Sequence, residues 1–261
     1  MKIIIDTDTL TDNVTSITAS SEDAAFPATN LQNDFTTDLY RAVADVLSVT
    51  LTILVSKGSA VALVNTNATS ATVTAGTGGS YENEAGYSYE AGYSNEDSEQ
   101  SVTLVYDLPG TGGRLWADYT NFTGPHIVKI TLTAATTVYA GIVRAGTVQS
   151  FADPAIGLSE GSKDYSVEKE LNNGADYFRK RNVVRTFGNL SIMETRANCY
   201  LFKQGIFDAV GPKPLAIRLV HNANITDKEF VVFAKRISPP EIVHRVNRTY
   251  SIVNFDLKEV I

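Results

Sequence analysis

Apolar and polar residues alternate along much of the first half of the chain. Between residues 46 and 53, Val46, Ser48, Thr50 and Thr52 alternate with leucine, valine and isoleucine. This period of two, enriched in β-branched residues, predicts a β-strand. Short strands separated by glycine and asparagine turns follow it, and this spacing predicts an antiparallel β-sandwich or jelly roll.

The other strands predicted for the first half are equally short. They are Lys2–Ile5, Val61–Val64, Thr69–Thr74, Val102–Tyr106, Leu115–Trp116, Ile127–Leu132 and Thr137–Val143. Residues 20–42 contain Pro27 and an Asn/Asp-rich stretch, which favour an extended loop over a helix.

The second half combines strands with one helix. An Asn172-Asn173-Gly174 turn predicts a hairpin between strands at 164–169 and 177–187. Residues 198–210 place apolar side chains at helical spacing and end at Gly211-Pro212, which predicts a helix there. Further strands are expected at 184–192, 215–220, 230–234 and 249–255. The chain is therefore expected to be mainly β, with an N-terminal sandwich followed by a smaller α+β module with one helix.

A glycine-rich stretch, residues 140–170, separates the two halves. Residues 1–150 hold 6 Lys/Arg and 16 Asp/Glu, a balance of −10, whereas residues 151–261 hold 16 and 13, a balance of +3. We expect a β-sandwich domain at 1–145 and an α+β module at 146–261, joined by a flexible segment at about 145–162. The second module is expected to open with DYSVEKE at 164–170.

An acidic loop interrupts the first domain at residues 76–100. It contains no basic residue and repeats the sequence EAGYS at 84–88 and 90–94. With few aliphatic side chains to bury, it is expected to be a mobile surface loop. Alternatively it is a contact arm, because Tyr87, Tyr89 and Tyr93 resemble the tyrosines of adaptable binding loops.

Trp116 follows a glycine-rich turn and has two interpretations. We expect the indole to pack over the end of the sandwich. The alternative is a surface contact, a platform on which a sugar ring stacks.

No sequence motif indicates an enzyme. There is no P-loop, GxGxxG, GxSxG or HExxH pattern, and the sequence identifies no catalytic, cofactor-binding or metal-binding residue. Cys199, the single cysteine, is expected to be a small buried apolar residue. The histidines, His126, His221 and His244, are expected at the surface or as caps.

Nucleic acid and membranes are not expected partners. The acidic first half lacks the concentrated Lys and Arg that bind phosphates. The N-terminal sequence MKIIIDTDTLTDN has three consecutive isoleucines, too few for a signal peptide or a membrane span.

Two parts of the chain resemble virion proteins from the tail tip or baseplate of tailed bacteriophages. ASSEDAAFPATNLQND (19–34) and VALVNTNATSATVTA (61–75) are similar to the discoidin-like β-sandwich that begins such proteins. AGIVRAG (140–146), AIGLSEGSKDYSVEKE (155–170), YFRKRNVVRTFGNLSI (177–192) and GPKPLAI (211–217) are similar to their C-terminal module. The acidic EAGYS loop departs from the pattern, as does Tyr40, which stands where a tryptophan is often found.

The resemblance implies a non-enzymatic structural subunit without a cofactor, made in the bacterial host cytoplasm and located in the virion tail. Its implied partners are other tail or baseplate proteins and copies of itself, in several copies around the tail axis. The alternative function is a carbohydrate-binding module that recognises a host surface glycan through Trp116 and the tyrosine loop.

Overall fold

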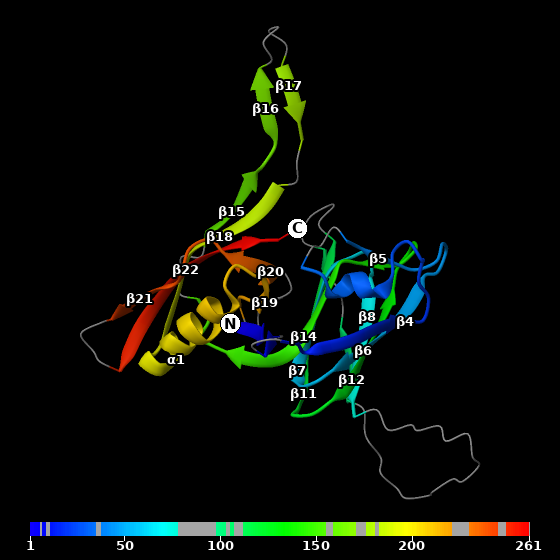
Figure 1. Ribbon diagram of the computed structural model, residues 1–261, viewed down its shortest axis with the longest axis horizontal. Coiled ribbons are helices and arrows are strands. Elements are labelled where there is room, and N and C mark those ends of the chain that lie inside the picture. Colours follow the sequence, from blue (N-terminus) through cyan, green and yellow to red (C-terminus); the bar gives the residue numbers. More distant parts are fainter. Residues whose placement is uncertain are drawn as a thin grey trace, which may run out of the picture. The chain divides into compact units, whose positions relative to one another are not determined.

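The chain forms two compact units, which we call the first and second modules (Figure 1). The computed structural model describes residues 1–5, 7–8, 11–34, 38–77, 98–102, 105–106, 112–154, 159–170, 176–180, 183–220, 230–244 and 249–260. The first module comprises Asp6–Asn33 and Asp38–Val148; the second comprises Met1–Ile5, Asp34–Thr37 and Gln149–Ile261.

The first module is a sandwich of antiparallel sheets. One sheet has the strand order β4 (Val14–Ala19), β6 (Ser48–Val55), β12 (His126–Thr133), β8 (Ser70–Gly76), β9 (Ser98–Val102). The other has the order β10 (Val105–Tyr106), β11 (Gly113–Phe122), β7 (Gly58–Thr66), β14 (Ile142–Ser150). Smaller elements are the pairs β2 (Thr7–Asp8) with β3 (Thr11–Asp12) and β5 (Tyr40–Arg41) with β13 (Tyr139–Ala140), and a 3₁₀ turn, η1 (Ala28–Gln32).

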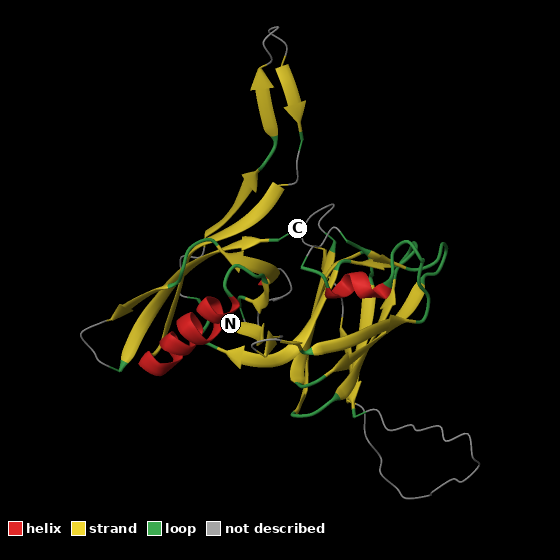
Figure 2. Cartoon of the chain, viewed as in Figure 1, coloured by secondary structure: helices red, strands yellow, loops and turns green. Residues whose placement is uncertain are grey.

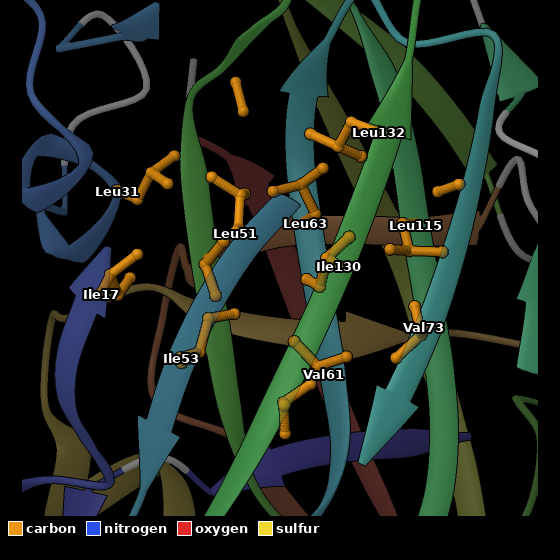
Figure 3. Packing of buried hydrophobic residues seen from close by; sticks show 14 of the residues in the cluster. Ile17, Leu31, Leu51, Ile53, Val61, Leu63, Val73, Leu115, Ile130 and Leu132 are labelled. Carbon is orange, nitrogen blue, oxygen red and sulfur yellow. The ribbon is translucent and has the colours of Figure 1, made fainter. Parts of the chain in front are cut away.

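The alternation in the sequence explains how the sandwich buries its core. In β6, Val49, Leu51, Ile53 and Val55 are buried while the residues between them are not. Strand β12 pairs with β6 in register from His126–Val55 to Thr133–Ser48 and repeats the pattern. Apolar side chains from both sheets meet in one cluster (Figure 3). The predicted N-terminal β-sandwich is confirmed.

The second module is built on one antiparallel sheet. Its strand order is β1 (Lys2–Ile5), β19 (Leu215–Arg218), β20 (Val231–Arg236), β22 (Tyr250–Glu259), β18 (Val183–Thr195), β15 (Ser159–Asp164), with β21 (Glu241–His244) also paired to β22. Strands β16 (Val167–Glu170) and β17 (Asp176–Arg179) form a separate hairpin. Figure 1 shows this hairpin projecting beyond β15 and β18, and we call it the arm.

One helix covers a face of this sheet (Figure 2). It begins as α1 (Arg196–Tyr200), capped by Thr195 Oγ1, which accepts from the backbone N–H of Asn198 at 3.3 Å. It continues with π-type hydrogen bonding as η2 (Leu201–Asp208). The buried residues Cys199, Phe202, Ile206 and Phe207 pack on the sheet. The predicted helix and the predicted buried cysteine are confirmed, so the fold is mainly β with an α+β second module.

The predicted domain boundaries need one correction. Residues 1–5 were expected in the sandwich, but they belong to the second module. The reason is long-range pairing, because Ile3 lies opposite Ile217 and is buried among second-module side chains. The two units divide after Val148, three residues beyond the predicted boundary.

The predicted flexible segment at 145–162 stays a prediction, and its residues 155–158 lie outside the described residues. Strand β14 extends to Ser150, and β15 begins at Ser159, so most of the described residues in that range are in strands. Strand β7 approaches this stretch closely, since a Cβ built on Gly58 would lie 2.8 Å from the Gly146 carbonyl oxygen. Glycine is needed at Gly58 because the two strands approach closely there.

Candidate functional site

The second-module sheet has one face in the core and one that points outward. Along β22, Val253, Phe255 and Leu257 are buried in the cluster that includes the helix. Because side chains alternate across a strand, Tyr250, Ile252, Asn254 and Asp256 belong to the opposite face. The helix does not cover this outer face, which therefore is the accessible side of β18, β22 and β21.

A row of apolar side chains crosses the outer face. Met193 of β18 lies opposite Ile252 of β22, and Ile252 lies opposite Val243 of β21. Met193 is 57% exposed and Val243 is 40% exposed. Tyr250, one step along the same face, is 47% exposed. We call these four residues the apolar row.

A pocket of about 440 Å³ lies next along the same face. The pocket is adjacent to the apolar row: its residues Glu241 and Asn254 pair with each other, and Asn254 lies two residues beyond Ile252 on β22. It is lined by Asn189, Leu190, Ser238, Pro239, Glu241, Asn254, Phe255 and Asp256. We call it the polar pocket.

A β-bulge shapes one wall of the polar pocket. The register between β18 and β22 shifts between Phe187 and Leu190, and Asn189 has a positive φ of 57°. The backbone N–H of Asn189 donates to Asp256 Oδ1 at 3.0 Å. The bulge therefore orients one oxygen of the Asp256 carboxylate.

The polar pocket is rich in hydrogen-bond acceptors. It carries the carboxylates of Glu241 and Asp256, the amides of Asn189 and Asn254 and the hydroxyl of Ser238, with no lysine or arginine in its lining. Two carboxylates without a basic residue among them favour a ligand that donates hydrogen bonds and carries positive charge. Within the described residues, no group of three or more His, Cys, Asp or Glu side chains is arranged to hold a metal ion.

The predicted contact residues fall elsewhere. Tyr87, Tyr89 and Tyr93 lie outside the described residues. Trp116 in β11 is 8% exposed, and its indole N–H donates to Asp118 Oδ1 at 3.1 Å. The exposed fraction agrees with the packing interpretation and leaves little ring surface on which a sugar could stack, so the prediction of a surface contact at Trp116 is corrected.

One histidine differs from expectation. His126 was expected at the surface or as a cap, but it is 1% exposed. Its Nδ1 lies 3.1 Å from the Gly124 carbonyl oxygen and its Nε2 lies 3.1 Å from the Tyr119 hydroxyl, while its ring stacks on Phe122. Since a carbonyl oxygen only accepts, Nδ1 carries the proton and Nε2 accepts from Tyr119. Burial lowers the pKa of His126, against the smaller opposing effect of the Gly124 hydrogen bond.

Sequence reasoning missed the outer face because the strand β21 was not predicted. Glu241–His244 is four residues long and follows Pro239-Pro240, which is typical of a turn. The signal that was present is the alternation from Tyr250 to Glu259, whose outward positions mix apolar and polar side chains.

Comparisons with known proteins give only distant likenesses. No family model and no curated protein matches the chain. A chain in a crystal structure of reduced XRCC1 bound to the DNA polymerase β catalytic domain is similar to it, with 15% identity and a TM-score of 0.35, covering 52% of this chain and 95% of that one. Two structures of chitosan-binding module 1, from a chitosanase/glucanase of Paenibacillus sp. IK-5, have 18% and 17% identity and TM-scores of 0.33. They cover 51% and 53% of this chain and 94% and 96% of theirs.

Among the described residues, no helix has both the length and the apolar character needed to cross a membrane.

Proposed function

We propose that the chain is a non-enzymatic structural subunit of a phage tail tip or baseplate that works through protein–protein contacts. The observation that carries the proposal is the apolar row. Met193, Val243 and Tyr250 are all between 40% and 57% exposed and belong to neighbouring strand positions on one sheet face. Grouped apolar side chains on a surface are typical of interaction sites, whereas single ones are ordinary.

The tail-tip or baseplate context rests on the resemblance to such virion proteins of residues 19–34, 61–75, 140–146, 155–170, 177–192 and 211–217. The apolar row is the part of the surface on which we expect a neighbouring subunit in that context. The outward-projecting arm is a second feature suited to contact, because an isolated two-stranded hairpin is marginally stable in water and gains from a partner.

The first test is composition. Mass spectrometry of purified phage particles should find this chain as a stoichiometric component, and its absence would overturn the proposal.

The second test addresses the apolar row with a matched pair of variants. Val243→Lys places a charge in the row, and we expect it to prevent incorporation into particles when it replaces the wild-type chain. Leu54→Lys is the control, because Leu54 is 39% exposed against 40% for Val243 and also lies in a strand, but in the first module. Equal incorporation of both variants would contradict a role for the apolar row.

A further inference from the structure

We propose that the polar pocket and the apolar row together bind the arm of a second copy of this chain, through Phe178 and Lys180. This inference rests on the proposed function and names the partner of the same surface.

The described part of the arm carries the complementary chemistry. Phe178, in β17, is 64% exposed, the largest exposed fraction among the large apolar residues of the described chain. Arg179 and Lys180 follow it directly and are both exposed. Phe178 thus supplies an apolar side chain for the row, and the residues after it supply cations for the carboxylates of Glu241 and Asp256.

The spacing of the two surfaces also matches. Phe178 and Lys180 are two positions apart, and so are Ile252 of the apolar row and Asn254 of the polar pocket. Residues two apart in an extended strand lie on the same face and about 7 Å from each other. Strand β17 ends at Arg179, so Lys180 lies just beyond the strand end, close enough in sequence to Phe178 for one side chain to meet the row while the other meets the pocket.

The arm cannot reach the polar pocket of its own chain. Val183 and Asn189 lie on the same strand, β18, and the six residue steps from one to the other span about 20 Å at 3.3 Å per residue. Figure 1 shows the arm leading away from that strand. The arm of the same chain therefore lies away from this pocket.

Lys180 has a weak competitor, Asp164, among the residues whose side chains the structure describes. It helps to lower the pKa of the Asp164 carboxyl, after the larger effect of the Ser166 hydrogen bonds. Asp164 is exposed, and an exposed ion pair holds a lysine only weakly. Lys180 remains available to a pocket that offers two carboxylates.

Because arm and pocket are different surfaces, the contact is head to tail. Such interfaces generate rings when the rotation closes and open chains when it does not. A single strand end buries less than the roughly 1,000 Å² expected of a stable interface, so the free chain associates weakly and the contact strengthens when several copies assemble.

Sedimentation velocity of the full chain over a wide concentration range tests the inference. We expect the wild-type mass to rise with concentration, and Glu241→Lys or Lys180→Glu alone to weaken association by about tenfold or more, since like charges then face each other. An equimolar mixture of the two variants keeps one intact arm and one intact pocket, so it should associate more strongly than either variant alone. Lys129→Glu, on an exposed position of β12 in the first module, is the control and should behave as wild type.

A wild-type chain that stays monomeric throughout, or a mixture that does not pair, would overturn the inference. The inference would also be overturned if Glu241→Lys and Lys180→Glu associated as strongly as the control Lys129→Glu. In assembled particles, cross-linking of Lys180 to a different protein in place of a second copy would overturn the identity of the partner. If the chain is monomeric in solution but present in phage particles, this inference is wrong and the proposed function is not contradicted. Failure of the inference can therefore be told from failure of the proposed function.

Discussion

The guanidinium of Arg185 lies 3.0 Å from the carboxylate of Glu259, measured from Nε to Oε2, and the two side chains are 8% and 2% exposed. A second contact joins Nη2 to Oε1 at 3.5 Å. Arg185 Nη1 also lies 3.3 Å from Glu160 Oε1. One arginine therefore joins β18, β22 and β15 of the second module by charge.

Removing the cation should leave a buried carboxylate without its compensating charge. We expect Arg185→Met to lower the free energy of unfolding of the second module by about 3 kcal/mol. Replacing both residues, Arg185→Met with Glu259→Met, should recover most of that loss. Urea denaturation followed by circular dichroism measures the free energy of unfolding of the single and the double variant. Glu160→Gln is the control, because Glu160 is 48% exposed and its loss should cost less than about 1 kcal/mol. A double variant no more stable than Arg185→Met would contradict the expectation.

The stability of the first module should depend on pH through His126. Burial lowers the pKa of His126 below its ordinary value of 6.5, so the folded state keeps the ring neutral while the unfolded chain takes up a proton. The contribution of His126 to the free energy of unfolding is then fully present above pH 6.5. It is lost as the pH falls below that value, by at most about 1.4 kcal/mol per pH unit. Thermal unfolding at about pH 7.5 and about pH 5.5 should show this loss in the wild type and a smaller one in His126→Gln.

The control for that measurement is His244→Gln, because His244 is exposed. It should keep the wild-type pH dependence. NMR titration of the His126 ring provides a direct check, and a midpoint at or above the ordinary value would disprove the expectation.

Trp116 should act as a packing residue. We expect Trp116→Ala to lower the free energy of unfolding by about 3 kcal/mol, because the side chain is almost fully buried. Trp116→Phe should retain more of that stability. On a glycan array, a wild-type chain that binds and a Trp116→Phe chain that is equally stable but does not bind would instead favour the carbohydrate-recognition alternative.

The close approach of β7 and β14 should make one glycine hard to replace. A Cβ at Gly58 would lie 2.8 Å from the Gly146 carbonyl oxygen and 2.9 Å from the Gly146 carbonyl carbon, so backbone would have to move. We expect Gly58→Ala to cost about 2 kcal/mol, in line with other overpacked sites. Gly124→Ala is the matched control, since a Cβ at Gly124 would have nothing within 4 Å of it. Equal melting temperatures of the two variants would contradict this reasoning.

Local patterns predicted most of the elements. The alternation in Ser48–Val55 and the apolar spacing before Gly211-Pro212 each depend on neighbouring residues, and both elements formed as expected. The pairing of Lys2–Ile5 with Leu215–Arg218 could not be predicted in the same way, because nothing in either segment specifies a partner more than two hundred residues away. The sequence prediction therefore places Lys2–Ile5 in the wrong module.

The candidate site was harder to predict for a related reason. Met193, Ile252 and Val243 are ordinary apolar residues in sequence, and they become a row only through the register of three strands. Likewise, Glu241 and Asp256 line one pocket because β21 pairs with β22 so that Glu241 lies opposite Asn254, two residues from Asp256. Trp116 drew attention as a conspicuous aromatic residue, yet conspicuous aromatics are most often buried.

The membership of Met1–Ile5 in the second module makes the sandwich an insertion between two parts of that module. During synthesis, the sandwich strands are all available once residue 148 has emerged, whereas Ile3 has to wait for Ile217 before its pairing can form. Domains generally fold as units during translation, so the sandwich is expected to fold first, with the opening segment still unpaired. Strand β1 is therefore synthesised before the sandwich but pairs with β19 only after the sandwich has folded.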